Sequence, residues 1–146
     1  MSNFRQLTET VMVSPQIDTN CIDEAAALGV TMIINNRPDD EDMGQPTNEE
    51  LSKYAADKGI KWAFIPVTSG QMTMEGIESM SFALRDSDKL LAYCRSGTRS
   101  CNMWGLAEAY VGGTSAEEIV RRASDAGYDL SGMVPTLEHL HSIARN

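Results

Sequence analysis

Basic residues, histidines, cysteines and long apolar runs are all scarce in this sequence. Twelve Lys and Arg stand against 21 Asp and Glu, and the resulting net charge of -9 repels nucleic-acid phosphates and anionic membrane surfaces. The three cysteines are too few and too irregularly spaced for a disulfide framework or a Cys-x-x-Cys metal site. No apolar run could span a bilayer, and residues 1–5 show no basic patch that leads into an apolar stretch. We therefore expect a cytoplasmic protein with reduced thiols that binds neither nucleic acid nor membrane.

Length and hydrophobic content predict one domain. The chain has 146 residues and 42% hydrophobic content, and neither repeats nor composition breaks divide it. We expect a single domain over residues 1–146. Four short apolar segments bounded by turn residues predict strands. These segments are 10–14, 30–35, 60–67 and 90–93.

Helices are predicted between and after these strands. Asp18, Thr47, Thr73 and Ser115 each stand where a side chain caps a helix N-terminus, and another helix is expected from Ser100. Strands that alternate with helices predict a three-layer α/β fold, with a mostly parallel sheet of four to five strands and helices on both faces. Ligands of such sheets bind beyond the carboxyl ends of the strands. The candidate segments at this edge are 35–42, 67–72 and 94–100.

The strongest functional signal is the loop between the last predicted strand and the next helix. Its sequence is Cys94-Arg95-Ser96-Gly97-Thr98-Arg99-Ser100. Backbone N–H groups and the positive end of the helix dipole would surround the Cys94 sulfur, which favours anion binding and the thiolate. Arg95 and Arg99 add positive charge, and Gly97 permits the backbone turn. We predict that Cys94 and Arg99 are catalytic. The predicted anion-binding residues of the loop are Arg95, Ser96, Gly97, Thr98 and Ser100.

The spacing of the loop separates two chemistries. Cysteine phosphatases carry an arginine after five intervening residues, where this chain has Ser100; Arg99 comes one residue early, and the loop resembles the Cys-Arg-x-Gly-x-Arg form of many rhodanese-type sulfurtransferases. Such phosphatases also take a general-acid aspartate from the loop after the preceding strand. Residues 68–71 contain no carboxylate, and Glu75 is the nearest candidate. Because sulfite or a thiolate leaves without protonation and an alkoxide does not, the missing acid favours sulfur transfer.

Over nearly its full length, the sequence resembles a bacterial family. The segments that carry the resemblance are Gly29–Arg37, Phe64–Val67, Tyr93–Ser100, Trp104 and Ala126–Tyr128. The family is the phosphatase-like domain found alone or fused to beta-lactamase-like metallohydrolases, and it is described both as a phosphatase and as a sulfur transferase. The resemblance implies the compact dual-specificity-phosphatase fold. The fusion partners resemble enzymes that oxidise persulfides. Because this chain lacks their metal-binding histidine motif, the resemblance implies that such a metallohydrolase would be a separate partner.

Several other polar residues have a functional and a structural interpretation. Arg37 ends the second strand at the candidate edge, where it could contact an anionic substrate or pair with nearby acids. We expect the acidic segment 39–42 to be a solvated loop rather than a calcium site. His139 and His141 lie on different faces of a predicted helix, so neither a metal nor another cofactor is expected. Cys101 could resolve an oxidised catalytic cysteine, but packing in the helix is the simpler interpretation.

These observations support three hypotheses. In the first, the Cys94 thiolate takes the outer sulfur of thiosulfate or a small persulfide, holds it as a persulfide and passes it to an acceptor thiol. In the second, the same nucleophile hydrolyses a phosphoester. In the third, the loop belongs to a non-catalytic module that binds an anion or a partner.

Overall fold

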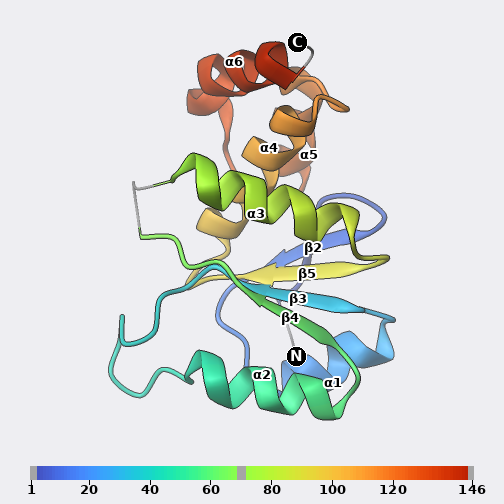
Figure 1. Ribbon diagram of the computed structural model, residues 1–146, viewed down its shortest axis with the longest axis vertical. Helices are drawn as coiled ribbons and strands as arrows, with labels where there is room; N and C mark the ends of the chain where they lie inside the picture. The colour runs from blue at the N-terminus through green and yellow to red at the C-terminus, as the bar shows by residue number, and fades with distance from the viewer. Residues whose placement is uncertain (1–2, 69–71, 145–146) are drawn as a thin grey trace.

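A five-stranded sheet forms the middle layer of the protein (Figure 1). The computed structural model describes residues 3–68 and 72–144. The strand order is β1-β2-β5-β3-β4, and neighbours pair in parallel except β1, which runs antiparallel to β2. The strands are β1 (Arg5–Gln6), β2 (Val11–Ser14), β3 (Met32–Asn35), β4 (Lys61–Phe64) and β5 (Leu90–Tyr93). The predicted mostly parallel sheet is therefore confirmed.

Three strands are shorter than predicted, and β2 starts at residue 11 instead of residue 10. The regular ladder of β4 ends at Phe64, although the N–H groups of Ile65 and Val67 still donate to the carbonyls of Asn35 and Asn36, both at 2.9 Å. β3 likewise starts at residue 32 instead of residue 30. Strand β1 was not predicted, because its two exposed residues show no alternation of apolar and polar side chains.

Helices cover both faces of the sheet, as predicted. In Figure 1, α1 and α2 lie below the sheet and α3 to α6 lie above it. The helices are α1 (Thr19–Ala27), α2 (Asn48–Asp57), α3 (Met74–Arg85), α4 (Thr98–Val111), α5 (Ala116–Asp125) and α6 (Val134–Ala144), with a short 3-10 turn η1 (Ser131–Met133) before α6. Within the described ranges, no helix is long and apolar enough to cross a membrane.

Central strand β5 contributes to two separate hydrophobic cores. Its side chains alternate between the faces of the sheet. Leu90 and Ala92 pack with Trp104 on the side of α3 to α6, and Leu91 and Tyr93 pack on the side of α1 and α2. All four residues of the strand are buried, because helices cover both faces. This double burial explains the continuous apolar run and holds the end of β5 firmly in place.

Side chains cap the N-termini of four helices, as the sequence predicts. Each capping side chain accepts a hydrogen bond from the backbone N–H three residues later, at 3.0 to 3.2 Å. The capping residues are Asp18, Thr47, Thr73 and Ser115. Helix α4 differs, because its N-cap is Gly97 and it starts two residues before the predicted Ser100. Its first N–H groups are therefore better placed to serve a ligand.

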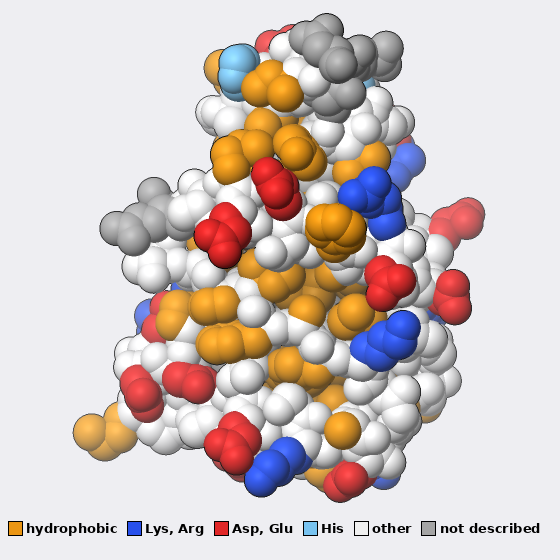
Figure 2. Space-filling view, viewed as in Figure 1, with side chains coloured by type: hydrophobic (Ala, Val, Ile, Leu, Met, Phe, Trp, Pro, Cys, Tyr) orange, Lys and Arg blue, Asp and Glu red, His pale blue; other side chains and the backbone are white. Residues whose placement is uncertain are grey.

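The face seen in Figure 2 has many exposed hydrophobic side chains over α3 and edge strand β4. Phe82 of α3 is 68% exposed, and Phe64 of β4 is 42% exposed. A cavity of about 700 Å³ lies here. It is lined by Met32, Ala63, Ile65, Ser79, Phe82, Ala83, Arg85 and Asp86. The cavity contains no nucleophile from the loop at 94–100, so its size alone does not make it the candidate active site.

Candidate active site

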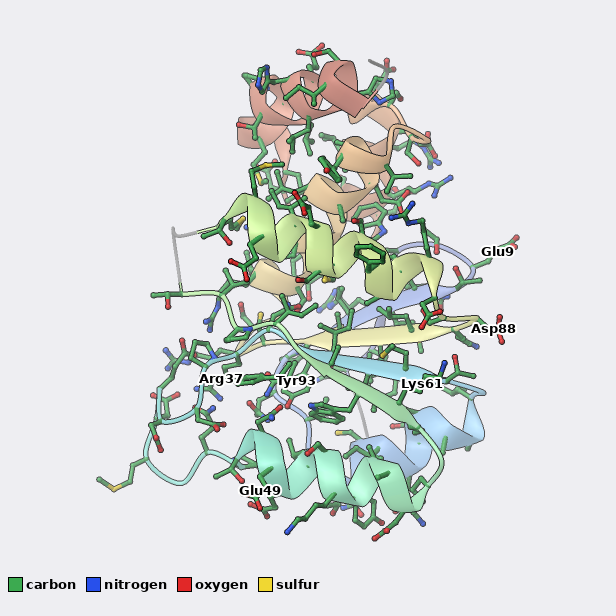
Figure 3. The ribbon with its side chains drawn as sticks, in the orientation of Figure 1. Glu9, Arg37, Glu49, Lys61, Asp88 and Tyr93 are labelled. Carbon is green, nitrogen blue, oxygen red and sulfur yellow. The ribbon has the colours of Figure 1, made fainter. Side chains whose placement is uncertain are left out.

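The carboxyl edge of the sheet brings together the segments that the sequence analysis singled out. Cys94 follows β5 directly, and Arg37 lies two residues beyond β3. Figure 3 shows Arg37 and Tyr93 at this edge of the sheet, and Lys61 and Asp88 at the opposite edge. The β3 and β5 ends are adjacent, because Asn35 is in register with Tyr93. The loops at 35–42 and 94–100 therefore meet.

Cys94 lies buried at the base of its loop, with no exposed surface. The N–H of Gly97 donates to the Cys94 sulfur at 3.1 Å, and the N–H of Cys94 donates to the Ser14 carbonyl at 3.3 Å. The sulfur therefore receives a backbone hydrogen bond beside the N-terminus of α4, where the helix dipole is positive. This arrangement suits a negatively charged sulfur or an anion bound next to it.

Gly97 is required by backbone conformation and by its contact with a distant residue. Its φ of 93° lies in the left-handed region, and a Cβ at this position would collide with the hydroxyl of Tyr128. The Tyr128 hydroxyl also donates to the Ser96 carbonyl at 3.3 Å. The Arg5 guanidinium lies over the Tyr128 ring, 6.0 Å from its centroid. Tyr128 thus connects β1 to the outer side of the cysteine loop.

Gly97→Ala should destabilise the protein by about 1–3 kcal/mol, because the new Cβ strains the backbone and meets Tyr128. Urea unfolding measures this loss. In a Tyr128→Phe background the loss should be smaller, because the hydroxyl that the Cβ meets is gone. If Gly97→Ala lowers the free energy of unfolding equally in both backgrounds, the Tyr128 hydroxyl does not contribute to the cost of the substitution.

Arg99 is bound end-on by a glutamate from the opposite loop. Its Nη1 donates to Glu41 Oε2 at 2.7 Å and to the Val67 carbonyl at 2.8 Å, and its Nη2 donates to Glu41 Oε1 at 2.8 Å. A guanidinium has five N–H donors, so the bonds to Glu41 and Val67 leave Nε–H and one Nη2–H, and the same guanidinium also interacts with the Cys94 sulfur. These two donors share one edge, which matches two oxygens of a phosphate or similar anion. The Glu41 carboxylate raises the pKa of Arg99, and the nearby Cys94 sulfur raises it further.

The carboxylate of Glu41 is held in its ionised form. The hydrogen bonds from Arg99, followed by those from Arg37, lower the pKa of Glu41 from 4.5 to about 2 even though partial burial opposes the shift. Arg37 Nε reaches Glu41 Oε1 at 2.9 Å. Residues 39–42 form an exposed loop, as predicted. The Glu41 side chain is nevertheless only 26% exposed and bridges two arginines, a pairing that was not predicted.

Replacement of Glu41 by glutamine should make stability less dependent on pH. A carboxyl with a lowered pKa stabilises the fold above its unfolded pKa of 4.5, and this stabilisation is lost as pH falls through about 2. We expect Glu41→Gln to cost about 2 kcal/mol at pH 6 and progressively less below pH 4.5. Urea unfolding between pH 3 and pH 6 measures the difference, with exposed Glu49→Gln as the control. A difference that does not change with pH would contradict the ion-pair role of Glu41.

Arg37 is paired with the nearby acidic residues, which is the structural one of the two roles considered for it. The residue is 3% exposed, and its Nη1 and Nη2 donate to Gln16 Oε1 at 2.9 Å and to Asp42 Oδ2 at 2.6 Å. With Glu41 on Nε, each nitrogen of the guanidinium has a protein partner. Arg37 therefore fixes the acidic loop at 39–42 against the site, and the structure gives no support to the predicted contact with substrate.

The remaining loop residues surround an open cavity of about 540 Å³. Arg95, Ser96, Thr98 and Arg99 line it, and Glu41, Met72 and Asn102 complete the lining. Ser96 Oγ donates to Thr98 Oγ1 at 3.0 Å, which braces the turn. Met72 belongs to the candidate segment 67–72, whereas Asn102 lies outside the candidate segments and was not predicted. The one-turn spacing between Thr98 and Asn102 along α4 could have indicated Asn102.

Ser100 lies in the first turn of α4 and is fully buried. Its Oγ donates to Asn36 Oδ1 at 2.8 Å, and Asn36 Nδ2 donates to the Ile65 carbonyl at 2.9 Å. These bonds join α4 to the ends of β3 and β4. Ser100 thus positions the loop, because its buried Oγ is bonded to Asn36 instead of facing the open cavity.

These elements match those of known proteins. Residues 3–111 match the phosphatase-like domain of the beta-lactamase hydrolase-like protein family. The chain belongs to this family. A beta-lactamase hydrolase-like protein of Xylella fastidiosa (strain 9a5c) is 30% identical to the phosphatase-like domain over 133 residues. The match covers 90% of this chain and 31% of that protein, so the chain spans about a third of the length of this curated relative. The family predicted from the sequence is confirmed.

Solved structures share the whole fold of the phosphatase-like domain. A protein of Neisseria meningitidis Z2491, provisionally named a phosphatase, is 30% identical, with a TM-score of 0.82 over 96% of this chain and 99% of its own. PTPMT1 has a TM-score of 0.76 over 97% of this chain and 96% of its own, at 16% identity. The second similarity concerns the fold alone. Together they confirm the predicted cysteine-phosphatase-like α/β architecture.

Cys101 lies in the hydrophobic core of the phosphatase-like domain. The residue is fully buried among the side chains packed by α4, and this burial raises the pKa of its thiol to about 12. A buried, protonated thiol is a poor nucleophile for thiol–disulfide exchange. The structure thus agrees with packing as the role of Cys101 and offers no support for a resolving cysteine.

Proposed function

We propose that this phosphatase-like domain hydrolyses phosphoesters through Cys94. The observation that carries the proposal is the position of Arg99, because Glu41 holds the end of its guanidinium and the same group interacts with the Cys94 sulfur near the N-terminus of α4. The Nε–H and one Nη2–H along one edge of the guanidinium are not used by Glu41 or Val67. A phosphoryl group could accept from this edge and from the loop N–H groups while phosphorus faces the sulfur. Membership of a phosphatase-like family supports the same reaction.

The reaction would proceed in two displacements. The Cys94 thiolate attacks phosphorus, a phosphorus–sulfur bond forms, and the ester phosphorus–oxygen bond breaks. The leaving group departs as a phenolate-type oxygen anion, which takes its proton from solvent water, so esters with acidic leaving groups are favoured. Water then attacks the phosphocysteine, releases inorganic phosphate and restores the thiolate. Arg99 and the α4 N-terminus stabilise the charge on the phosphoryl oxygens in both steps. Glu41 keeps the guanidinium in the orientation that this role needs.

The phosphocysteine is the species to look for. The protein is mixed with para-nitrophenyl phosphate, quenched in acid within the first turnovers and analysed by intact-protein mass spectrometry and peptide mapping. We expect one added phosphoryl group on the peptide that contains Cys94, together with steady release of nitrophenol. Absence of both turnover and adduct across several pH values would overturn the proposal. Tight phosphate binding without either would favour the non-catalytic module.

Sulfur transfer is the second candidate, and two observations favour it. Arg99 follows Cys94 one residue earlier than in cysteine phosphatases, so the cradle is smaller. The carboxylate that lines the described cavity is Glu41, whose pKa of about 2 makes it unsuited to donate a proton at neutral pH. A persulfide on Cys94 after exposure to thiosulfate, reversed by a thiol, would establish this reaction. The acceptor thiol and any persulfide-oxidising metallohydrolase would then be separate molecules.

A further inference from the structure

The three arginines at the site differ in how firmly protein partners hold them. Arg37 is buried with all three nitrogens bonded, and Arg99 is held end-on by Glu41. Arg95 is different, because its side chain is 67% exposed and its Nε meets Asp42 Oδ2 at 3.3 Å in an ion pair. That same oxygen already accepts from Arg37 at the shorter distance of 2.6 Å. The Asp42 carboxylate therefore pairs mainly with Arg37, and its ion pair with Arg95 is longer and weaker.

Arg95 and Arg99 line the same open cavity. Glu41 also lines it, but both of its carboxylate oxygens already accept from arginines. A ligand whose phosphoryl group occupies the available edge of Arg99 would have the exposed Arg95 guanidinium beside it. Exposed ion pairs are weak, so an anionic group of a ligand can replace Asp42 with little loss. Guanidinium forks bind carboxylates and phosphates with two parallel hydrogen bonds.

We propose that the substrate of this domain carries a second anionic group, a carboxylate or a further phosphate, and that Arg95 recognises it. Asp42 occupies Arg95 until such a substrate arrives. This inference rests on the proposed phosphoester hydrolysis and adds a substrate class to it. The protein as a whole carries a net charge of -9, so selection of a doubly anionic substrate needs a local cation that protein carboxylates hold only weakly. Arg95 meets this requirement.

Two aryl phosphates of nearly equal shape test the proposal. One is 3-carboxyphenyl phosphate, and the other is 3-carbamoylphenyl phosphate, in which a neutral amide replaces the carboxylate. We expect the wild-type kcat/KM to be roughly fivefold higher for the carboxylate, the size of effect that an exposed ion pair allows. The preference should fall as ionic strength rises, because the pair is exposed to solvent.

Substitutions of Arg95 show whether this residue causes the preference for the carboxylate substrate. Arg95→Gln should reduce the ratio of the two kcat/KM values to near one, and Arg95→Glu should bring it below one, because like charges then oppose the carboxylate. Arg95→Lys keeps the charge and should keep part of the preference. Lys53→Gln, which removes an exposed cation on α2, should leave the ratio unchanged. A wild-type ratio near one, or a ratio that Arg95→Gln does not change, would overturn the proposal.

Binding separates this inference from the reaction itself. In Cys94→Ser protein, isothermal titration measures the affinity for both aryl phosphates without turnover. Tighter binding of the carboxylate, lost in Arg95→Gln/Cys94→Ser, supports the role of Arg95 even if wild-type protein hydrolyses neither ester. Equal binding of the two compounds overturns it even if the wild-type protein hydrolyses both.

Discussion

Cys94→Ser should lower the turnover of para-nitrophenyl phosphate by at least ~10³-fold and abolish the phosphocysteine. A serine hydroxyl is a weak nucleophile unless a neighbouring base takes its proton. The Gly97 N–H and the Arg99 guanidinium both interact with the Cys94 sulfur, and both are donors that cannot accept that proton. Steady-state assays and the acid-quench mass measurement check both parts of this prediction.

The same substitution at another cysteine provides the matched control for Cys94→Ser. Cys21 lies on α1, is only partly buried and packs against the core on the far face of the sheet. Cys21→Ser should therefore keep wild-type turnover. Urea unfolding of both variants shows whether either change acts through stability. A folded Cys94→Ser protein that keeps a tenth of the wild-type rate would remove Cys94 from the proposed reaction.

Short-range sequence patterns were sufficient to predict the helices and strands that position the site. β5 was predicted at its observed bounds because a strand buried on both faces is a continuous apolar run. The caps at Asp18 and Thr47 were predicted because a capping side chain and the N–H it accepts from are three residues apart. The cysteine loop was recognised because its charged and flexible residues follow a buried strand directly. Each of these signals lies within a few residues of the feature it predicts.

The contacts that orient the site join residues far apart in the chain, and local signals do not reach that far. Arg99 and Glu41 are separated by 58 positions, and Ser100 and Asn36 by 64. An acidic segment after β3 is equally compatible with a solvated loop until the strand order is known. Because β3 and β5 are neighbours, that segment meets the arginines of the cysteine loop. The predicted convergence of 35–42 and 94–100 contained this information, and charge complementarity between the two could have indicated the pairing.

Arg99→Lys should lower kcat by ~10³-fold, the scale on which an arginine that contacts a transferred phosphoryl group contributes. Lysine keeps the positive charge but lacks the fork that contacts Glu41 at one end and offers Nε–H and Nη2–H along its side. A single ammonium cannot make both sets of contacts, so the charge would remain while its orientation is lost. Single-turnover measurements with para-nitrophenyl phosphate separate this loss in the chemical step from any change in substrate binding.

The contrast with Arg95→Lys shows whether orientation or charge is at work at Arg99. Arg95 is exposed and makes one ion pair at 3.3 Å, so the same substitution there should change kcat by no more than about threefold. If Arg99→Lys is folded and also loses less than tenfold, the end-on pair with Glu41 serves only to close the acidic loop over the site. A large loss at Arg99 beside a small one at Arg95 would instead mean that the loop owes its reactivity to a guanidinium held in one orientation. Glu41, from a loop 58 positions away, would then be part of the catalytic apparatus because it sets that orientation.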